Sequence, residues 1–356
     1  WTTGPKAIKF ENEFKNFIGS KYAVSANSWT AAAHLSLEAI GIKADDEVII
    51  PTITFTATAE IICYFNAKPV LVDIQPDTLN IDPEKIEQAI TDKTKAIIPV
   101  HYGGQPCDMD EIMAIAKKYN LKVIEDAAHS LPASYKNKII GTIGDVTCFS
   151  FYATKTLATG EGGMICTQDE EIAERCSIMR LHGISKDAWK RYSAEGSWYY
   201  EVIAPGYKYN FTDIQAALGL SQLKKIQEML QLRENIFQHY TLGFKDEELI
   251  SVPKINKDRK SAHHLYSLQI DFTKLKINRS QFIDKLKDAG IGASVHFIPI
   301  YRHPFYKDNF NLKLDDYPMS EKVYPSLVSL PIWPGISELQ LEHVINSVKN
   351  ILMEYK

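Results

Sequence analysis

One lysine, Lys155, lies in a stretch made mostly of aromatic, small and glycine residues, FSFYATKTLATGEGGMICT, residues 149–167. A lysine that folding removes from water must lose its charge, find a counter-charge or form a covalent bond. In its uncharged form the amine is a good nucleophile toward an aldehyde. The alternative is a partly exposed lysine whose aliphatic stem packs on Phe or Tyr, which is the commoner case for a lysine taken at random.

A second set of chemically capable residues occurs in VIEDAAHS, residues 123–130, where an apolar strand pattern ends in Asp126. Ligands of open α/β sheets bind at the carboxyl ends of the strands. An aspartate there could hold a cationic ring nitrogen, in a pair worth roughly 4 kcal/mol before desolvation at ~4 Å and an effective dielectric near 20. His129 could pack on or bond to a substituent of that ring. The alternatives are a helix-capping aspartate and a structural histidine.

The segment SANSWTAAAH, residues 25–34, predicts a helix that begins near Ser28 and Thr30. Free backbone N–H groups and hydroxyls at a helix N-terminus form a phosphate site, although plain N-capping explains Ser28 equally well. Asn210, in PGYKYNFTDIQAALG (205–219), precedes another helix. Its loop could deliver the amide to a phosphate, or could simply be a well-capped helix start.

An aromatic residue, Phe55, follows a predicted strand end at Pro51 in PTITFTATAEII, residues 51–62. A ring at a sheet edge could stack on a flat cofactor, and ordinary core packing is the alternative.

The elements that must position these residues alternate along the first half of the chain. The predicted strands are EVIIP, PVLVD, AIIPV, KVIED, VTCFSF and GMICT, and helical patterns between them include 30–41, 83–90, 109–120 and 169–181. Such alternation predicts βαβ units and a mainly parallel sheet. The strands are apolar throughout, as expected where helices cover both faces of the sheet.

The pattern changes after a periodic stretch from Asp213 to about Tyr240, which predicts one long helix. Beyond it we expect strands at 263–271 and 291–297 and helices at 279–290 and 338–355. These elements predict a large domain over residues 1–240 and a small C-terminal α/β domain over residues 241–356.

Composition restricts the possible partners. The chain has 356 residues, a net charge of −4 and no basic run, so we expect no nucleic-acid surface. Its five cysteines include no CxxC pair, so neither a disulfide framework nor a metal site is expected, and a reducing cytoplasm is the default location. No apolar run reaches membrane-spanning length.

Together these features match the needs of pyridoxal phosphate, namely an amine for the aldehyde, a carboxylate for the ring nitrogen, an aromatic ring face and a phosphate cup. The segments SFYATKTLATGEGG, EDAAH, WTTGP, GYKYNFTDIQAALGLSQL and the Ser-x-Thr helix start resemble the DegT/StrS family of sugar-nucleotide aminotransferases. The resemblance runs from residue 1 to the last helix. It implies a fold-type-I, aspartate-aminotransferase-like α/β architecture and a homodimer with shared active sites.

By similarity to that family, Lys155 bonds covalently to pyridoxal phosphate, Asp126 pairs with the ring nitrogen, His129 lies near the ring and Phe55 stacks on it. The other cofactor-binding residues that the family implies are Ser28, Trp29, Thr30 and Ser150 at the phosphate, and Asn210 from the neighbouring subunit. Trp29 departs from the Gly or Ala of many members, so its large side chain needs a place. Leu131-Pro132 replaces the commoner His-Gly or Val-Gly.

The resemblance implies transamination, with L-glutamate as donor, pyridoxamine phosphate as the intermediate form of the cofactor, and a keto-sugar nucleotide as acceptor. The RLHG and GYKYN segments look most like UDP-sugar 4-aminotransferases, such as the one that forms UDP-4-amino-4-deoxy-L-arabinose. A 3-keto-sugar aminotransferase and a non-catalytic regulatory relative remain as alternatives. His296 resembles a family position near the substrate, and Tyr301 and His303 are weaker candidates.

Overall fold

The computed structural model describes residues 3–185 and 200–356, and its centre is a seven-stranded sheet in the order β1-β9-β8-β5-β4-β2-β3. The strands are β1 (Tyr22–Ala26), β2 (Glu47–Pro51), β3 (Lys68–Val72), β4 (Thr94–Ile97), β5 (Lys122–Asp126), β8 (Val146–Ser150) and β9 (Gly163–Thr167). Within this sheet only β9 runs antiparallel to its neighbours. The predicted α/β architecture with a mostly parallel, mixed sheet is confirmed.

The strand directions bring one set of loops together. The carboxyl ends of β1, β2, β4, β5 and β8 lie at the same edge of the sheet, and the reversed strand β9 begins there. The loops after parallel strands therefore converge at that edge, although they are far apart in the sequence.

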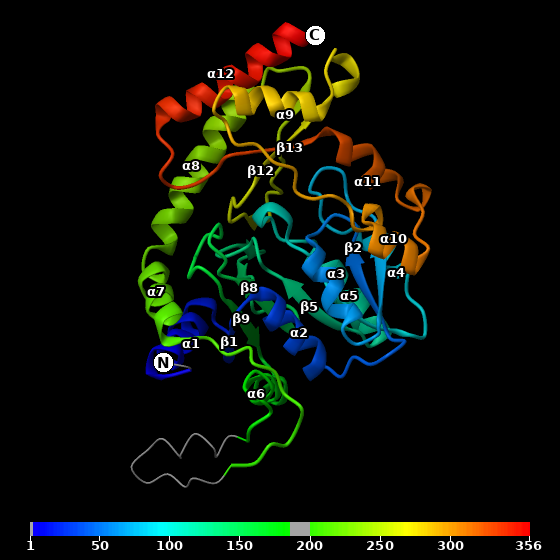
Figure 1. Ribbon diagram of the computed structural model, residues 1–356, viewed down its shortest axis with the longest axis vertical. Helices are drawn as coiled ribbons and strands as arrows, with labels where there is room; N and C mark the ends of the chain where they lie inside the picture. Colours follow the sequence, from blue (N-terminus) through cyan, green and yellow to red (C-terminus); the bar gives the residue numbers. More distant parts are fainter. Residues whose placement is uncertain (1–2, 186–199) are drawn as a thin grey trace.

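Helices cover both faces of this sheet, as the apolar strands require (Figure 1). On one face lie α1 (Pro5–Ile18), α4 (Pro83–Gln88), α5 (Met109–Tyr119) and α7 (Asp213–Leu223), and on the other α2 (Trp29–Ala39), α3 (Thr56–Cys63) and α6 (Glu170–Met179). Side chains alternate between the two cores, so that Val48 and Ile50 pack on one face and Ile49 on the other.

A second, antiparallel sheet contains β10 (Ile250–Ser251), β12 (Tyr266–Ile270) and β13 (Leu327–Leu330). It shares a separate hydrophobic core with α8 (Ile226–Phe244), α9 (Arg279–Asp288) and α12 (Glu338–Tyr355). We call this assembly the C-terminal unit, and it occupies the top of Figure 1. A small sheet of β6 (Ser134–Tyr135), β7 (Lys138–Ile139) and β11 (Arg259–Lys260) links residues from the two halves of the chain.

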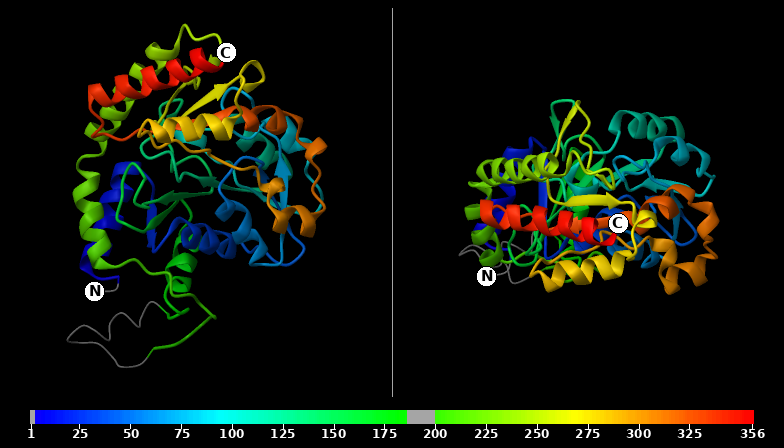
Figure 2. Two further views of the ribbon diagram at one scale, coloured as in Figure 1. Left: turned by 45° about the horizontal axis from the view of Figure 1, so that its top comes forward. Right: turned by 90° about the horizontal axis from the view of Figure 1, so that it is seen from above.

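The chain returns to the main sheet between two elements of the C-terminal unit. Ile300, Tyr301 and Tyr306 pack in the core that contains α2 and α3. This returning segment, residues 300–323, includes α10 (Pro304–Phe310) and α11 (Pro318–Val323), which are orange in Figure 2. A domain boundary near residue 240 remains our proposal, with the returning segment packed against the large domain.

Two expectations about elements are wrong. The predicted long helix is divided, because a turn at residues 224–225 separates α7 from α8. The predicted strand at residues 291–297 is irregular, with one isolated bridge between Ser294 and Ser329. Among the helices in residues 3–185 and 200–356, none is long and apolar enough to cross a lipid bilayer.

Candidate active site

A cavity of about 550 Å³ lies at the edge of the main sheet where the loops converge. Nine of the predicted site residues line it: Ser28, Trp29, Thr30, Phe55, Asp126, His129, Ser150, Lys155 and His296. They come from the ends of three strands, β2, β5 and β8, from the start of α2 and from the irregular segment before the returning segment. The topology of the sheet thus assembles residues separated by up to 268 positions in the chain.

Lys155 presents its amine to this cavity from the loop that follows β8. Burial disfavours the ammonium form and lowers the pKa of Lys155 to about 8, while the nearby Asp126 carboxylate acts in the opposite direction. Near neutral pH the amine is therefore uncharged in a minor fraction of molecules, far more than for a solvated lysine. The uncharged amine is the form that attacks an aldehyde.

Asp126 is the last residue of β5 and is buried at the cavity wall. Its Oδ2 accepts a hydrogen bond from Thr58 Oγ1 at 3.0 Å, and its Oδ1 accepts one from the backbone N–H of Ala128 at 3.1 Å. Burial raises the pKa of Asp126 to about 6, against the opposing effect of these bonds. A cationic group placed beside the carboxylate would favour its charged form.

The neighbouring acid, Glu125, lies on the opposite face of the sheet and is fully buried. Its Oε2 pairs with His101 Nε2 at 3.0 Å, and its Oε1 accepts hydrogen bonds from Gly144 N and Thr147 Oγ1, each at 2.8 Å. His101 Nδ1 accepts from a backbone N–H, so Nε2 carries the proton that is donated to Glu125. This network fixes the end of β5 and thereby the position of Asp126.

The start of α2 forms a second wall of the cavity. Ser28 is its N-cap, with a side chain that accepts from Ala31 N at 3.0 Å. Trp29 directs its indole into the core, where Nε1 donates to the Cys148 carbonyl at 3.0 Å, so this side chain leaves the cup open. A Cβ at Gly163 would lie 2.4 Å from the Ser28 carbonyl oxygen. Only glycine there lets the helix start approach the sheet so closely.

Aromatic rings form the third wall. The His129 ring stacks on Phe297 with centroids 5.8 Å apart and lies 4.4 Å from the His264 ring. Phe55 is 59% exposed and lies 5.9 Å from Phe297. Burial lowers the pKa of His129 and His264 well below the usual value, so both imidazoles are neutral. Each Nδ1 is buried without a partner among the residues described.

The structure does not bring three predicted residues to this cavity. Asn210 is buried elsewhere, with Oδ1 accepting from Lys208 Nζ at 2.5 Å. Tyr301 is buried in the core and donates its hydroxyl to Glu321 at 2.7 Å. His303 is the N-terminal flanking residue of α10. Neither Tyr301 nor His303 lies among the residues that line the cavity.

Sequence reasoning missed Thr58 and His264. Thr58 lies three residues after Phe55 on α3, and its threonine-rich surroundings carried no signal that the hydroxyl would reach Asp126. His264 comes from the segment before β12 and lines the same cavity as Lys155. The paired HH in HHLYSLQID was a visible signal, but only the fold places it beside His129.

The residues that line the cavity fit pyridoxal phosphate. The volume is in the range of small-molecule sites, and an amine of lowered pKa lies in the same cavity as a buried carboxylate. The N-terminus of α2 supplies N–H groups and hydroxyls for a phosphate. The unpartnered Nδ1 of His129 is available to a polar ligand atom.

Comparisons with known proteins agree with this chemistry. Residues 1–349 match the model of the DegT/DnrJ/EryC1/StrS aminotransferase family. The chain is 50% identical over 350 residues to the spore coat polysaccharide biosynthesis protein SpsC of Bacillus subtilis, covering 98% of this chain and 90% of that protein. It is 57% identical over 353 residues to an uncharacterised protein of Methanocaldococcus jannaschii, covering 99% and 92%.

Comparison with solved structures also identifies aminotransferases as similar proteins. A putative sugar aminotransferase from Streptococcus pneumoniae in its pyridoxamine phosphate form has a TM-score of 0.93 at 34% identity, over 99% of this chain and 93% of that one. The pyridoxal phosphate form of that protein has a TM-score of 0.92 at 33% identity, over 99% and 92%. The Helicobacter pylori aminotransferase PseC, involved in pseudoaminic acid biosynthesis, has a TM-score of 0.92 at 32% identity, over 99% and 92%.

The match covers almost the whole chain, and the cavity carries the amine, the carboxylate and the helix start that pyridoxal phosphate chemistry needs. The chain therefore belongs to the DegT/DnrJ/EryC1/StrS family of pyridoxal-phosphate-dependent sugar aminotransferases.

Proposed function

We propose that this enzyme transfers the amino group of L-glutamate to the C4 carbonyl of a UDP-4-keto sugar, giving an amino-sugar nucleotide for surface polysaccharide or glycoconjugate synthesis. The observation that carries the proposal is the Lys155 amine in one cavity with the buried Asp126 carboxylate. The likeness to PseC and to a spore coat polysaccharide protein supports a nucleotide-sugar acceptor.

Pyridoxal phosphate, when bound, supplies an aldehyde and a ring that accepts electrons. In the proposed mechanism Lys155 would hold the aldehyde and, when freed from it, its amine would act as the base that takes a proton from the donor α-carbon and as the acid that returns it. A lysine pKa of about 8 suits both directions of that transfer, because a general acid–base works best near the operating pH. Asp126 would keep the ring nitrogen protonated, and its two hydrogen bonds fix the carboxylate in position.

The remaining residues bind and orient. Ser28, Thr30 and the backbone of Trp29 would hold the phosphate at the start of α2, with Ser150 across from them at the end of β8. Phe55 would cover one ring face. His129 would bond to a ring substituent through its Nδ1, which is buried without a partner among the residues described.

We propose a homodimer in which Asn210 reaches the cavity of the neighbouring subunit. Asn210 lies outside the cavity of its own chain, just before α7. On α7 two apolar side chains face outward, with Ile214 65% and Leu218 51% exposed. Exposed apolar side chains at this density are typical of an interaction surface.

The first test is Lys155→Ala in the purified enzyme. The variant should lose turnover with glutamate and a UDP-4-keto-6-deoxyhexose, and it should lose the absorbance band at roughly 410–430 nm that a protein-bound lysine–cofactor linkage gives. Substantial residual turnover would remove the core of the proposal. A non-catalytic relative would keep the band without bleaching on addition of glutamate.

The second test decides the position of amination. The wild-type enzyme, glutamate and matched 3-keto and 4-keto nucleotide sugars would be compared by kcat/KM. A preference for the 3-keto sugar would replace the C4 assignment and leave transamination intact.

A further inference from the structure

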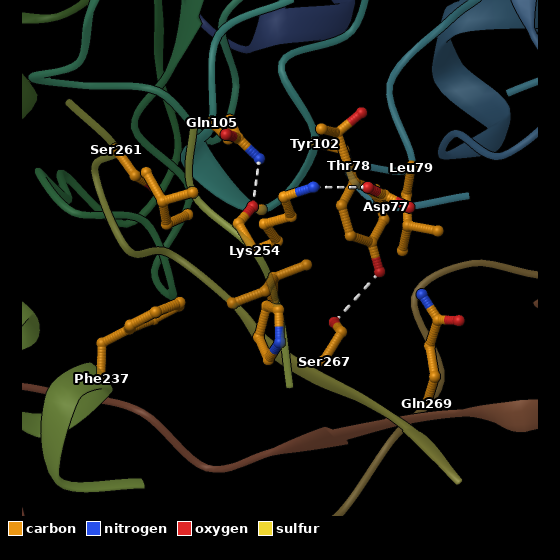
Figure 3. Close-up of a pocket in the computed structure, with 14 residues that line it drawn as sticks. Asp77, Thr78, Leu79, Tyr102, Gln105, Phe237, Lys254, Ser261, Ser267 and Gln269 are labelled. Atoms are coloured by element: carbon orange, nitrogen blue, oxygen red, sulfur yellow. Dashed lines mark hydrogen bonds and ion pairs between the residues drawn. The ribbon is translucent and has the colours of Figure 1, made fainter. Parts of the chain in front are cut away.

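Three hydroxyl groups connect the side chain of His296 to its own backbone carbonyl. His296 Nδ1 lies 3.0 Å from Ser329 Oγ, and Ser329 Oγ lies 3.0 Å from Ser267 Oγ. Ser267 Oγ lies 3.1 Å from the Tyr102 hydroxyl, which itself donates to the His296 carbonyl. The contacts close into a ring, and Figure 3 shows the part between Tyr102 and Ser267.

The ring joins the main body of the protein to the C-terminal unit. Tyr102 follows β4 in a short 3-10 helix, η1 (Tyr102–Gly104), whereas Ser267 and Ser329 lie on β12 and β13. All three side chains are buried, at 5%, 6% and 4% exposure. The adjacent cavity measures about 30 Å³, which is room for a water and excludes a substrate. Tyr102 and Ser267 line this cavity, so a nucleotide sugar does not fit beside either hydroxyl.

Counting hydrogens fixes the direction of every bond in the ring. Four contacts need four hydrogens, and the three hydroxyl groups supply three. The Tyr102 hydrogen goes to a carbonyl, which can only accept, so Ser267 must donate to Tyr102 and Ser329 must donate to Ser267. The fourth hydrogen must come from His296 Nδ1, since a buried contact between two lone pairs is unfavourable.

We infer that Tyr102, Ser267 and Ser329 are positioning residues that hold His296 as its Nδ1–H tautomer and present Nε2 to the active-site cavity as a hydrogen-bond acceptor. His296 lines that cavity, and Nε2 makes no hydrogen bond to the residues described. Burial lowers the pKa of His296 to about 4, so the ring is neutral and its tautomer is defined.

This polarity limits what His296 can recognise. An unprotonated Nε2 accepts from a hydroxyl and cannot donate to a keto or phosphate oxygen. We assign its partner as a hydroxyl of the nucleotide sugar, and this assignment rests on the proposed function. His296 would then favour one orientation of the sugar by binding its hydroxyl and leaving the carbonyl to face the cofactor.

The tautomer can be read directly from two-bond ¹H–¹⁵N correlations of the cofactor-loaded enzyme labelled at histidine nitrogens. His296→Gln identifies the resonance by its disappearance. In the wild type we expect the hydrogen on Nδ1, and finding it on Nε2 would overturn the inference. This NMR measurement needs no substrate, so its result does not depend on whether the proposed reaction is correct.

Ser267→Ala tests the hydroxyl ring at a residue that does not touch His296. Ser329 then has no serine acceptor and should donate to His296 Nδ1, which moves the hydrogen to Nε2. Tyr102→Phe should give the same inversion by freeing the Ser267 hydrogen, and it serves as the second variant if the first does not fold. An unchanged tautomer in both would overturn the role of the ring.

Kinetics test the ligand assignment. Ser267→Ala should raise KM for a UDP-4-keto-6-deoxyhexose about tenfold, the effect of one lost hydrogen bond, and leave the half-reaction with glutamate unchanged. Thr241→Val is the matched control, because Thr241 bonds Tyr266 in the same core but lies outside the ring. An unchanged KM in Ser267→Ala would overturn the hydroxyl assignment, whereas a wild type inactive on every keto sugar would refute the proposed function and leave the tautomer result intact.

Discussion

At Lys155, burial and the Asp126 carboxylate act on one amine in opposite directions, and burial is the larger effect. The balance leaves the amine able to react near neutral pH, which a solvated lysine does only at much higher pH. Covalent capture of pyridoxal phosphate by the cofactor-free protein should therefore speed up as pH rises through about 8, because only the uncharged amine reacts.

Replacement of Asp126 tests this balance. Asp126 raises the pKa of Lys155, so Asp126→Asn should lower it and move the midpoint of the capture profile to lower pH. Stopped-flow absorbance across pH 6 to about 10 measures the midpoint in both proteins. A midpoint that moves upward would contradict the stated electrostatics. Turnover should fall by about a thousandfold, the scale of losing a pair worth roughly 4 kcal/mol.

Thr58 offers a second prediction at the same scale. Its hydroxyl donates to Asp126 and opposes the effect of burial on the carboxyl. Thr58→Val should raise the pKa of Asp126, so the acid limb of the kcat profile should move to higher pH. Thr58→Ser keeps the hydroxyl and should restore the wild-type profile. If serine behaved like valine, the hydrogen bond would not be the cause.

At the scale of elements, the approach of α2 to the sheet edge depends on Gly163. An added Cβ would meet the Ser28 carbonyl oxygen at 2.4 Å, well inside van der Waals contact. Gly163→Ala should displace the start of α2 and weaken pyridoxal phosphate binding by about tenfold or more, since backbone shifts of this kind cost about 1–3 kcal/mol. Fluorescence titration of the cofactor measures the change.

The control for this substitution is Gly292→Ala. Gly292 has no atom within 4 Å of an added Cβ and no positive φ, so its replacement should leave cofactor affinity unchanged. Equal losses in the two variants would mean that glycine replacement acts through general destabilisation and not through the start of α2.

Elements with a strong local pattern were predictable, because one apolar face or one continuous apolar run determines them. Five of the six predicted strands of the main sheet and α9 follow their sequence patterns closely, whereas β4 begins before AIIPV and ends within it, and β1 was not predicted. The break between α7 and α8 was not predictable, since the apolar period continues through Leu223 and Ile226 while the backbone turns between them. The segment 291–297 looked like a strand, but its polar partners on β13 and at Tyr102 hold it in an irregular path.

The residues of the candidate site also fall into those that the sequence could predict and those that it could not. Asp126 ends β5 and Lys155 follows β8, so their meeting at one edge follows from the parallel pairing of these strands. Tyr301 and His303 lie close to His296 in sequence, yet the returning segment carries them away from the cavity. His264 depends on packing between the two sheets, which local sequence does not determine.

At the scale of the whole molecule, Asp73 anchors the returning segment to the main sheet. Its carboxylate accepts from Met319 N at 2.8 Å and from the backbone N–H and hydroxyl of Ser320 at 2.9 and 2.5 Å. Asp73→Ala leaves these buried donors without their acceptor. The free energy of unfolding should fall by about 2–4 kcal/mol, measured by urea titration.

Asp315→Ala is the matched control, because Asp315 is an exposed aspartate in the same segment. Its free energy of unfolding should change by less than about 0.5 kcal/mol. A loss at Asp73 no larger than that at Asp315 would show that the anchor adds no stability.

The path of the chain limits how far the C-terminal unit can move relative to the main body. It leaves the main body along α8, comes back where Ile300 N donates to the Thr52 carbonyl at 2.9 Å, and departs again between α11 and β13. The C-terminal unit is thus connected to the main body by three crossings of the chain and not by a single hinge. A unit held in this way can shift by small sliding movements but cannot rotate through a large angle, so the opening of the active-site cavity should change little in width. Cleavage of the chain at one of the three crossings should leave the two parts associated through the other two.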